Sequence, residues 1–596
     1  MPNLVVVGFN GTLLHHHPSP GSRSSGGRRH RRPGRIRAGL DRPSHLQIHA
    51  AQFFHPRRSL RPLVASRLSP FTAALVPMAL VATVAVVASP VRPAAAAVAL
   101  MAGQRARPLN GSFNKVPVLH SNQPEEVEGP GILISTEPGM SYAAEDGRAL
   151  RNAEFTFNGE FGVHMHHKYF PDYRSQIRPG ERRTELTLGL ILINPGLRPV
   201  QIRFERGAVR NSFEAPYLAN HLMGVKPLGV RPWNTGPGDA TAVQMLRGNL
   251  DRQLSEQITI PPRSRVVLFR TQLPALGIAN ALLRGRSNGP FQMAVVAARN
   301  PYSDADLVAV LDQRRLAPGR VYLNQVAAIN SRRVFSRVGG VALGDEYQAS
   351  IKHDLNRQGP LHVPLTSTVR HHFGTQDIQV NPLASRMIDS SLDNVGTYGV
   401  RFDVDLNLYG SGPYELVMSH PTVAGLNPFT AFRGSLQIRT PDGLEEVHVG
   451  LRSGQSLGLT TLNLRPGVSN PVRVSVVYPA DATPGHLLSV VPATQLAMVQ
   501  AREQAQQAAA AAGPAPAATP RPTPAAPATP RPAAPPVATP RRQAPPVAPA
   551  TPRARPLAPT ATTPAPTGRQ VSPSLLDRYQ EALDAQRRMM RELMGP

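Results

Sequence analysis

The residues best suited to chemistry in this sequence are three histidines in one short segment, His164, His166 and His167. On a β-strand, residues i and i+2 point to the same face, so two of these imidazoles could share a metal ion. A metal site needs further ligands, and the histidines that could supply them are distant in the sequence: His353, His362, His371 and His372. The segment supports one hypothesis, a metal-dependent hydrolase or metal-binding protein. The alternative is a set of histidines that face solvent or are hydrogen-bonded within a sheet.

A second motif has the composition of a hydrolase site. Residues 285–289, Gly-Arg-Ser-Asn-Gly, match the G-x-S-x-G spacing of a nucleophile that sits between a strand and a helix. Pro290 and a strand-like segment, Phe291–Val295, follow instead of a helix. The motif therefore predicts a loop between two elements.

Paired carboxylates are the third candidate. Asp403 and Asp405 share one face of a predicted strand, about 7 Å apart by strand rise, and glycosidases use two carboxyl groups. Arg401 and Asn407 lie on the same face, which favours a solvated polar surface. We therefore assign no catalytic, cofactor-binding or metal-binding residue from the sequence and predict that the protein is not an enzyme.

The single tryptophan, Trp233, lies in a loop rich in Pro and Gly, residues 230–238. An indole ring on such a loop either stacks on a sugar or a peptide, or packs against the end of a β-sandwich. Both interpretations stay open.

The elements that must position these residues are mostly strands. From about residue 107 to 492, Gly and Pro punctuate the sequence and period-two alternation is more frequent than helical spacing. Val200–Glu205 alternates as a strand with one face in a core does, whereas Glu185–Ile193 predicts a more fully buried strand. Asn194-Pro195-Gly196 joins the two through residues that favour turns.

A unit of strand, proline-bearing turn and strand recurs along the chain, which is typical of a sandwich. Four stretches carry it: 185–205, 258–269, 398–418 and 462–476. We predict a mainly β fold with two tandem antiparallel β-sandwich domains of Ig-like type, at residues 105–300 and 320–498. A short helix capped by Ser303 connects them within residues 301–319.

Several short segments of this middle region together resemble an exported cyanobacterial domain family of unknown function. They are Gly131–Thr136, Phe157–Phe161 with His166-His167, Gly340–Asp345, Phe373–Thr375 and Gly396–Val400. The resemblance implies export and a place in the cell envelope, and it implies no catalytic residues.

The net charge of +27 would suit a nucleic-acid-binding protein, but the charge is concentrated at the two ends. Residues 1–103 hold 13 arginines and one acidic residue, residues 499–596 hold 12 basic and 5 acidic residues, and the middle keeps a surplus of only 8. Aromatic residues for base stacking make up 5% of the chain. We predict no nucleic-acid partner, and the absence of cysteine excludes disulfides and thiolate metal sites.

Residues 61–99 have the pattern of a signal peptide or signal anchor. Basic residues precede the mostly apolar stretch 71–88, and Ala95–Ala99 offers small-residue cleavage positions. If the signal is retained, residues 71–88 are the one membrane contact, near the lower length limit for a spanning helix. We expect an exported protein of the periplasm or cell envelope, either released or anchored in the cytoplasmic membrane. Residues 1–60 predict a disordered basic leader, either a mis-assigned start or a cytoplasmic tail.

The C-terminal region changes composition after Gln500. Residues 501–573 are rich in Ala, Pro and Thr and repeat Ala-Thr-Pro-Arg, which predicts a disordered, extended linker. Residues 574–594 predict an amphipathic helix too short to be stable alone, so it needs a second copy, an envelope protein or the chain's own sandwich as its partner. The sequence thus favours a non-enzymatic envelope protein for structure, adhesion or wall attachment, with a cell-wall glycan or an envelope protein as its partner.

Overall fold

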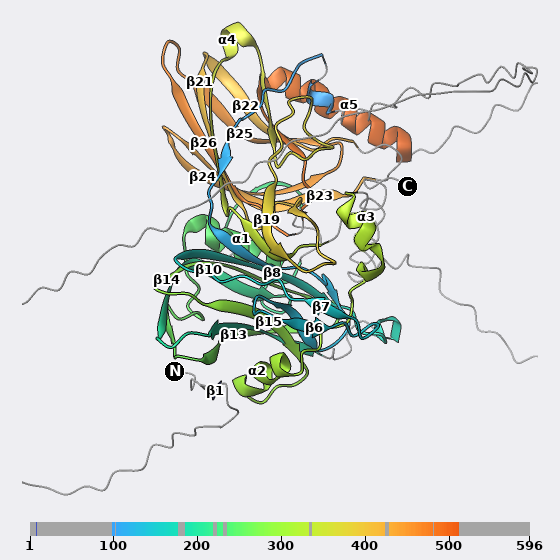
Figure 1. Ribbon diagram of the computed structural model, residues 1–596. Coiled ribbons are helices and arrows are strands. Elements are labelled where there is room, and N and C mark those ends of the chain that lie inside the picture. The colour runs from blue at the N-terminus through green and yellow to red at the C-terminus, as the bar shows by residue number, and fades with distance from the viewer. Residues whose placement is uncertain are drawn as a thin grey trace, which may run out of the picture. The chain divides into compact units, whose positions relative to one another are not determined.

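The computed structural model describes residues 7–8, 98–101, 103–176, 185–217, 223–229, 235–332, 337–422, 428–480 and 482–511. Strands dominate these residues and form four larger sheets and one two-stranded sheet (Figure 1). The predicted mainly β class is confirmed. The leader and signal, apart from residues 7–8 and 98–99, lie outside the described residues, as do Trp233, the Pro-rich linker from residue 512 and the predicted terminal helix.

Two sheets share the first hydrophobic core. The smaller sheet has the order β1 (Val7–Gly8), β13 (Ser264–Pro274), β9 (Glu185–Asn194), β15 (Gln292–Ala298) and β5 (Gly131–Ser135). The larger sheet has the order β12 (Gln257–Ile260), β10 (Val200–Asn211), β14 (Ile278–Ser287), β8 (Glu160–Tyr169), β3 (Pro117–Ser121), β16 (Gly339–Leu343), β19 (Asn381–Arg386) and β20 (Asp393–Asn394), with β4 (Glu126–Val127) beside β8. A separate ribbon joins β6 (Met140–Tyr142) to β7 (Ala149–Arg151).

A second pair of sheets shares a second core. The larger has the order β11 (Gly224–Pro227), β24 (Gly443–Arg452), β23 (Thr430–Thr440), β26 (Asn470–Val477), β21 (Arg401–Tyr409), β17 (Glu346–Asp354) and β2 (Ser112–Phe113). The smaller has the order β18 (Leu361–Leu365), β27 (His486–Val491), β22 (Gly412–Ser419) and β25 (Ser456–Leu464). We call these two pairs the first and the second sandwich.

Helices are short and lie at the sheet surfaces. The described helical segments are η1 (Ala99–Met101), η2 (Arg174–Gln176), α1 (Pro237–Arg247), α2 (Asp304–Asp312), η3 (Leu323–Gln325), α3 (Val326–Asn330), α4 (Leu355–Gln358) and α5 (Ala493–Ala511). Helix α2 is the predicted connection, and Ser303 and Asp306 form its capping box. Helix α1 packs on β10 and β14 of the first sandwich and on β23 and β26 of the second. No helix in the described ranges has the length and apolar character needed to cross a membrane.

The predicted strand faces are present where the sequence placed them. In β10, Val200, Ile202 and Phe204 are buried while the residues between them are exposed, and β9 is buried over most of its length. The two strands belong to opposite sheets. The turn between them is held by Asn194, whose Oδ1 accepts from the Gly196 N–H at 2.9 Å.

The sequence repeat corresponds to a repeated pairing. In the first sandwich β9 pairs with β13 and β10 with β12, and in the second β21 pairs with β26 and β22 with β25. In both sandwiches, two consecutive strands cross from one sheet to the other. A later pair of consecutive strands crosses back and lies antiparallel beside the first pair. Each stretch of the repeat is thus a pair of consecutive strands that belong to opposite sheets of one sandwich.

Two features differ from a simple tandem of antiparallel sandwiches. Strands β3 and β4 run parallel to β8, and β17 runs parallel to β21, so the sheets are mixed. Strands also cross between the halves: β16, β19 and β20 extend a sheet of the first sandwich, whereas β2 and β11 join the second. Parallel pairing and edge addition depend on long-range register, which local alternation does not encode.

The segment Val98–Met101 packs on helix α5. Val98 and Leu100 are buried in a small cluster with Val491, Leu496 and Val499, and Gln495 Nε2 donates to the Leu100 carbonyl at 2.9 Å. Figure 1 shows α5 beside β22 and β25. Val98 and Leu100 thus belong to the packed part of the chain.

We predict that Leu100→Ala lowers the free energy of unfolding by about 2–4 kcal/mol, because it removes a buried leucine from this cluster. Urea unfolding followed by circular dichroism measures the change. Met498→Ala, at an exposed position on helix α5, on which Leu100 packs, serves as the control and is expected to stay within about 0.5 kcal/mol. Equal effects of the two substitutions would contradict the packing.

Candidate functional site

Strand β8 carries the predicted histidine cluster, and the structure divides it between two faces. His164 and His166 share one face, as the spacing predicts, and both are 1% exposed. His164 Nδ1 lies 3.2 Å from Nδ1 of His120, which the parallel register of β3 places opposite it. His166 Nδ1 lies 3.1 Å from Asn280 Oδ1 on β14. Sequence reasoning missed His120, which lies 44 residues before His164 and in no motif.

His167 faces the first core instead. Its Nε2 lies 2.8 Å from Ser121 Oγ and its Nδ1 lies 2.7 Å from the Pro124 carbonyl, so both ring nitrogens have partners. Burial lowers the pKa of His120 and of His167 to about 3 and that of His164 well below its usual value. These imidazoles are therefore neutral at physiological pH, and they serve as polar links between strands.

The other histidines proposed as ligands lie elsewhere. His353 Nδ1 is 2.7 Å from Arg107 Nη1, and His362 Nδ1 is 2.8 Å from Ser489 Oγ. His371 lies beside His420, with ring centroids 6.4 Å apart. Within the described ranges, no group of three or more His, Asp or Glu side chains is arranged to hold a metal ion. The structure thus does not bring the predicted ligands together.

A buried charge cluster lies near the end of β8. The Glu125 carboxylate accepts from Lys168 Nζ at 2.6 Å and pairs with Arg337. Burial alone would raise the pKa of Glu125, but the charges of Arg337 and Lys168 outweigh it, and the pKa is lowered. The three side chains come from segments far apart in the sequence, so the sequence pattern could not predict this cluster. They join β8 to the segment that leads into β16.

One buried group has the residue types of a catalytic triad but not its geometry: Ser435, His448 and Asp239. Asp239 Oδ2 lies 3.0 Å from His448 Nδ1 and accepts from Ser435 Oγ at 3.0 Å. In a triad the serine contacts Nε2, opposite the aspartate, whereas Ser435 Oγ is 3.5 Å from Nδ1. All three side chains are buried, and they tie α1 to β23 and β24. The arrangement is a structural contact between the sandwiches.

Imidazole and phenol rings form a buried row that continues from the first sandwich into the second. Neighbouring ring centroids lie 5.0, 6.2, 6.2, 5.8, 5.2 and 6.4 Å apart. In order the rings belong to His120, His164, Tyr398, Tyr478, His486, His420 and His371. Burial lowers the pKa of His420 to about 3 and that of His371 to about 4. The row therefore places several neutral histidines next to one another, together with two tyrosines.

The remaining sequence candidates have structural roles. Gly285–Ser287 end strand β14, a short turn and then β15 follow, and Ser287 Oγ accepts from the Gly159 N–H at 3.0 Å. The predicted loop is therefore wrong for Gly285–Ser287, which lie in the strand, and holds only for Asn288 and Gly289. Asp403 and Asp405 share a face of β21 as predicted, and each is paired with an arginine, Arg401 at 2.7 Å and Arg473 at 2.6 Å.

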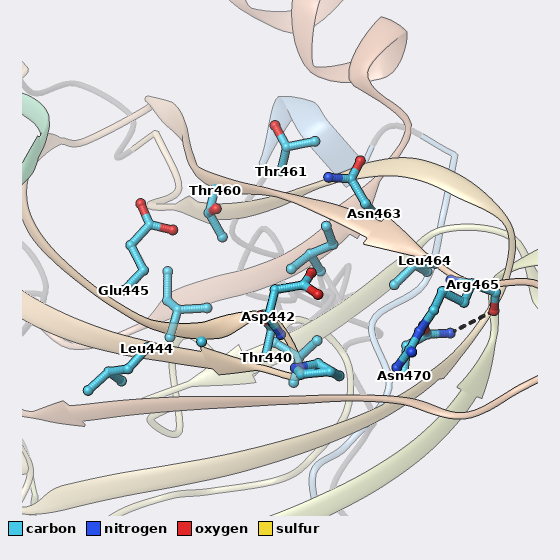
Figure 2. A pocket seen from close by; sticks show the side chains of 15 residues that line it. Thr440, Asp442, Leu444, Glu445, Thr460, Thr461, Asn463, Leu464, Arg465 and Asn470 are labelled. Atoms are coloured by element: carbon cyan, nitrogen blue, oxygen red, sulfur yellow. Dashed lines mark hydrogen bonds between the residues drawn. The ribbon is translucent and has the colours of Figure 1, made fainter.

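The second sandwich contains an open groove of about 500 Å³ (Figure 2). It lies between the β23–β24 hairpin and the corner from β25 to β26, where the two sheets separate. The floor is apolar and belongs to the second core, with Ile438, Leu462 and Val472. The rim is polar, with hydroxyl, amide and charged side chains: Thr440, Asp442, Glu445, Thr460, Thr461, Asn463 and Arg465.

The loops beside the groove are held by short hydrogen bonds. The Asp442 N–H donates to Thr440 Oγ1 at 3.2 Å, which supports the hairpin turn. Asn470 Nδ2 donates to the Arg465 carbonyl and its Oδ1 accepts from the Arg465 N–H at 2.9 Å, across the loop in Figure 2. The rim side chains thus stand on a backbone that is already fixed. Sequence reasoning did not find this groove, because its residues come from four strands and the turns between them and share no motif.

The fold defines a mainly β protein of two linked sandwiches, with its titratable clusters buried and a polar groove open at one end. The chain belongs to the protein family of unknown function DUF3370, whose model matches residues 104–492. No curated protein matches the chain. A solved structure of a Paenibacillus xanthan lyase is 9% identical, with a TM-score of 0.12, and the match covers 62% of this chain and 26% of the lyase. The chain thus spans about a quarter of that enzyme.

Proposed function

We propose that this protein is an exported, non-catalytic component of the cell envelope that binds cell-wall glycan in the groove of the second sandwich. The groove itself carries the proposal. A sugar ring has an apolar face of C–H groups and an edge of hydroxyls, and the groove offers an apolar floor beneath a rim of hydroxyl, amide and carboxylate groups. Its volume of about 500 Å³ falls within the range of small-molecule sites.

Two features of the sequence support the location. Residues 61–99 have the order of an export signal, and the Pro-rich segment 501–573 is suited to a spacer that keeps the sandwiches away from an anchoring point. A second copy or an envelope protein bound by residues 574–594 would then fix the other end. In this proposal the groove holds the glycan and the tails position it.

We predict that Asn463→Ala and Asp442→Ala each weaken binding of an N-acetylglucosamine oligosaccharide about fivefold, because each removes hydrogen bonds worth about 1 kcal/mol. Isothermal titration calorimetry on residues 98–511 measures Kd, and co-sedimentation with isolated cell walls tests the polymer. Asn356→Ala, at an exposed position on α4, is the matched control and leaves Kd unchanged.

The same samples separate binding from catalysis. Chromatography of the oligosaccharide after prolonged incubation is expected to show no cleavage. If the oligosaccharide is cleaved and Asp442→Ala abolishes the cleavage, the protein is a glycosidase and the proposal is wrong. The proposal is also overturned if neither the oligosaccharide nor the cell wall binds.

A further inference from the structure

A second cavity, of about 560 Å³, lies in the first sandwich beside helix α2. One wall is the segment from Ala298 to Tyr302 that leads from β15 into the helix. The opposite wall is the segment from Arg315 to Pro318, and the helix contributes Val310 and Gln313. Pro130, Pro301 and Pro318 make the walls stiff and partly apolar. The cavity is far in sequence from every residue of the groove in Figure 2.

Tyr302 stands at the edge of this cavity with 98% of its surface exposed. Its backbone is nonetheless fixed, because the Asp306 carboxylate accepts from the N–H groups of Tyr302 and Ser303, both at 2.8 Å. The phenol ring therefore projects into solvent from a rigid helix start. An aromatic ring presented in this way can stack on the apolar face of a sugar at a low entropic cost.

The charge of the cavity is positive. Arg299 and Arg315 line it, and both are exposed. The backbone of Arg315 is held in the fold, since its carbonyl accepts from the Ile132 N–H at 2.9 Å. Asp306 is the one carboxylate in the lining, and its hydrogen bonds to the backbone and side chain of Ser303 and to the backbone of Tyr302 lower its pKa. All three of these bonds end on Oδ2, so the carboxylate is held against the helix cap, and the two arginines leave the lining with a net positive charge.

We propose that this cavity is a second glycan site, which binds a sugar carrying a carboxylate. The ring of Tyr302 stacks on the sugar, and a guanidinium of Arg315 or Arg299 pairs with the carboxylate in a charge-assisted hydrogen bond. The amides of Asn300 and Gln313 face the same space and suit the hydroxyls. The inference extends the proposed function by naming an acidic ligand class, and it concerns a site separate from the groove.

The test compares oligogalacturonate with its methyl ester, which keep the same rings but differ in charge. Calorimetry on residues 98–511 is expected to show that oligogalacturonate binds about tenfold more tightly than the ester. Arg315→Gln and Tyr302→Ala each weaken the acidic ligand about tenfold. Arg314→Gln is the matched control, because this arginine is exposed, adjacent in sequence and outside the cavity lining, and it leaves Kd within twofold.

Three outcomes would overturn the inference. Equal binding of acid and ester removes the role of the carboxylate, and equal loss in Arg315→Gln and Arg314→Gln shows general charge attraction. Binding that falls in Asn463→Ala but not in Tyr302→Ala assigns the acidic ligand to the groove. If the groove variants lose neutral-glycan binding but keep oligogalacturonate binding, the acidic-sugar site is supported as a site separate from the groove.

Discussion

The protein is expected to unfold on mild acidification, between about pH 6.5 and pH 5. The cause is its set of buried neutral histidines. Burial lowers the pKa of His120, His167 and His420 to about 3 in the folded state, whereas the same groups in the unfolded chain titrate near 6.5. Protons therefore bind preferentially to the unfolded chain throughout this window.

The direction of this pH effect follows from the coupling between proton binding and folding. Above pH 6.5 both states carry neutral imidazoles, so the full stability is present. Below it the unfolded state binds more protons, and each such histidine lowers the free energy of unfolding by about 1.4 kcal/mol per pH unit until the folded pKa is reached. By pH 5 each histidine has removed about 2 kcal/mol, and three of them have removed about 6 kcal/mol, against a typical total of about 5–15 kcal/mol.

Urea midpoints at pH 7.5, 6.5, 5.5 and 5.0 test this prediction. His420→Gln removes one buried imidazole and is expected to reduce the slope of stability against pH by about 1.4 kcal/mol per unit below pH 6.5, whatever it costs at pH 7.5. His167→Gln, in the other sandwich, should do the same. A midpoint that stays constant from pH 7.5 to pH 5 would show that these groups titrate normally in the fold.

The second large effect is expected at the ion pair of Arg320 and Asp389. Both side chains are fully buried, and Arg320 Nη1 lies 3.0 and 2.9 Å from the two carboxylate oxygens. Nη2 of the same guanidinium donates to the Leu133 carbonyl at 2.6 Å, and Gln123 Nε2 donates to Asp389 at 3.0 Å. The pair thus joins β5, the segment before β4 and the β19–β20 connection inside the first sandwich.

Asp389→Asn is predicted to lower the free energy of unfolding by about 3–5 kcal/mol, because it leaves the Arg320 charge buried without a counter-ion. Chemical denaturation at pH 7.5 measures the loss. Arg320→Met combined with Asp389→Leu removes both charges, and we expect it to recover part of that loss. Arg203→Met, in an exposed pair with Glu256, is the matched control and changes stability by less than about 1 kcal/mol. A similar cost for the exposed and the buried pair would contradict the argument.

Local pattern predicted the strands well. The alternation of Val200–Glu205 and the apolar run of Glu185–Ile193 correspond to β10 and β9, and Ser303 caps the connecting helix. These features depend on neighbours within a few residues, so the sequence contains them directly. Parallel pairs such as β3 with β8, and the exchange of β16 and β2 between the sandwiches, depend on contacts between segments far apart in the chain.

The candidate sites show the same division. The spacing of His164 and His166 correctly placed both on one face of a strand, but it could not identify His120 and Asn280 as their neighbours. The spacing also could not show that burial keeps His120 and His164 neutral. The groove around Asn463 and the cavity around Tyr302 have no motif, because each is lined by residues from several elements that are not consecutive in a short segment.

By itself the sequence determined a mainly β chain, because residue alternation, turn residues and composition are local properties; the export-type leader stays a prediction. Only the tertiary structure decided which polar residues are enclosed and which are open to a ligand. Burial depends on long-range strand pairing: it makes His164 and His167 of β8 neutral links between strands and leaves the polar rim of the groove exposed.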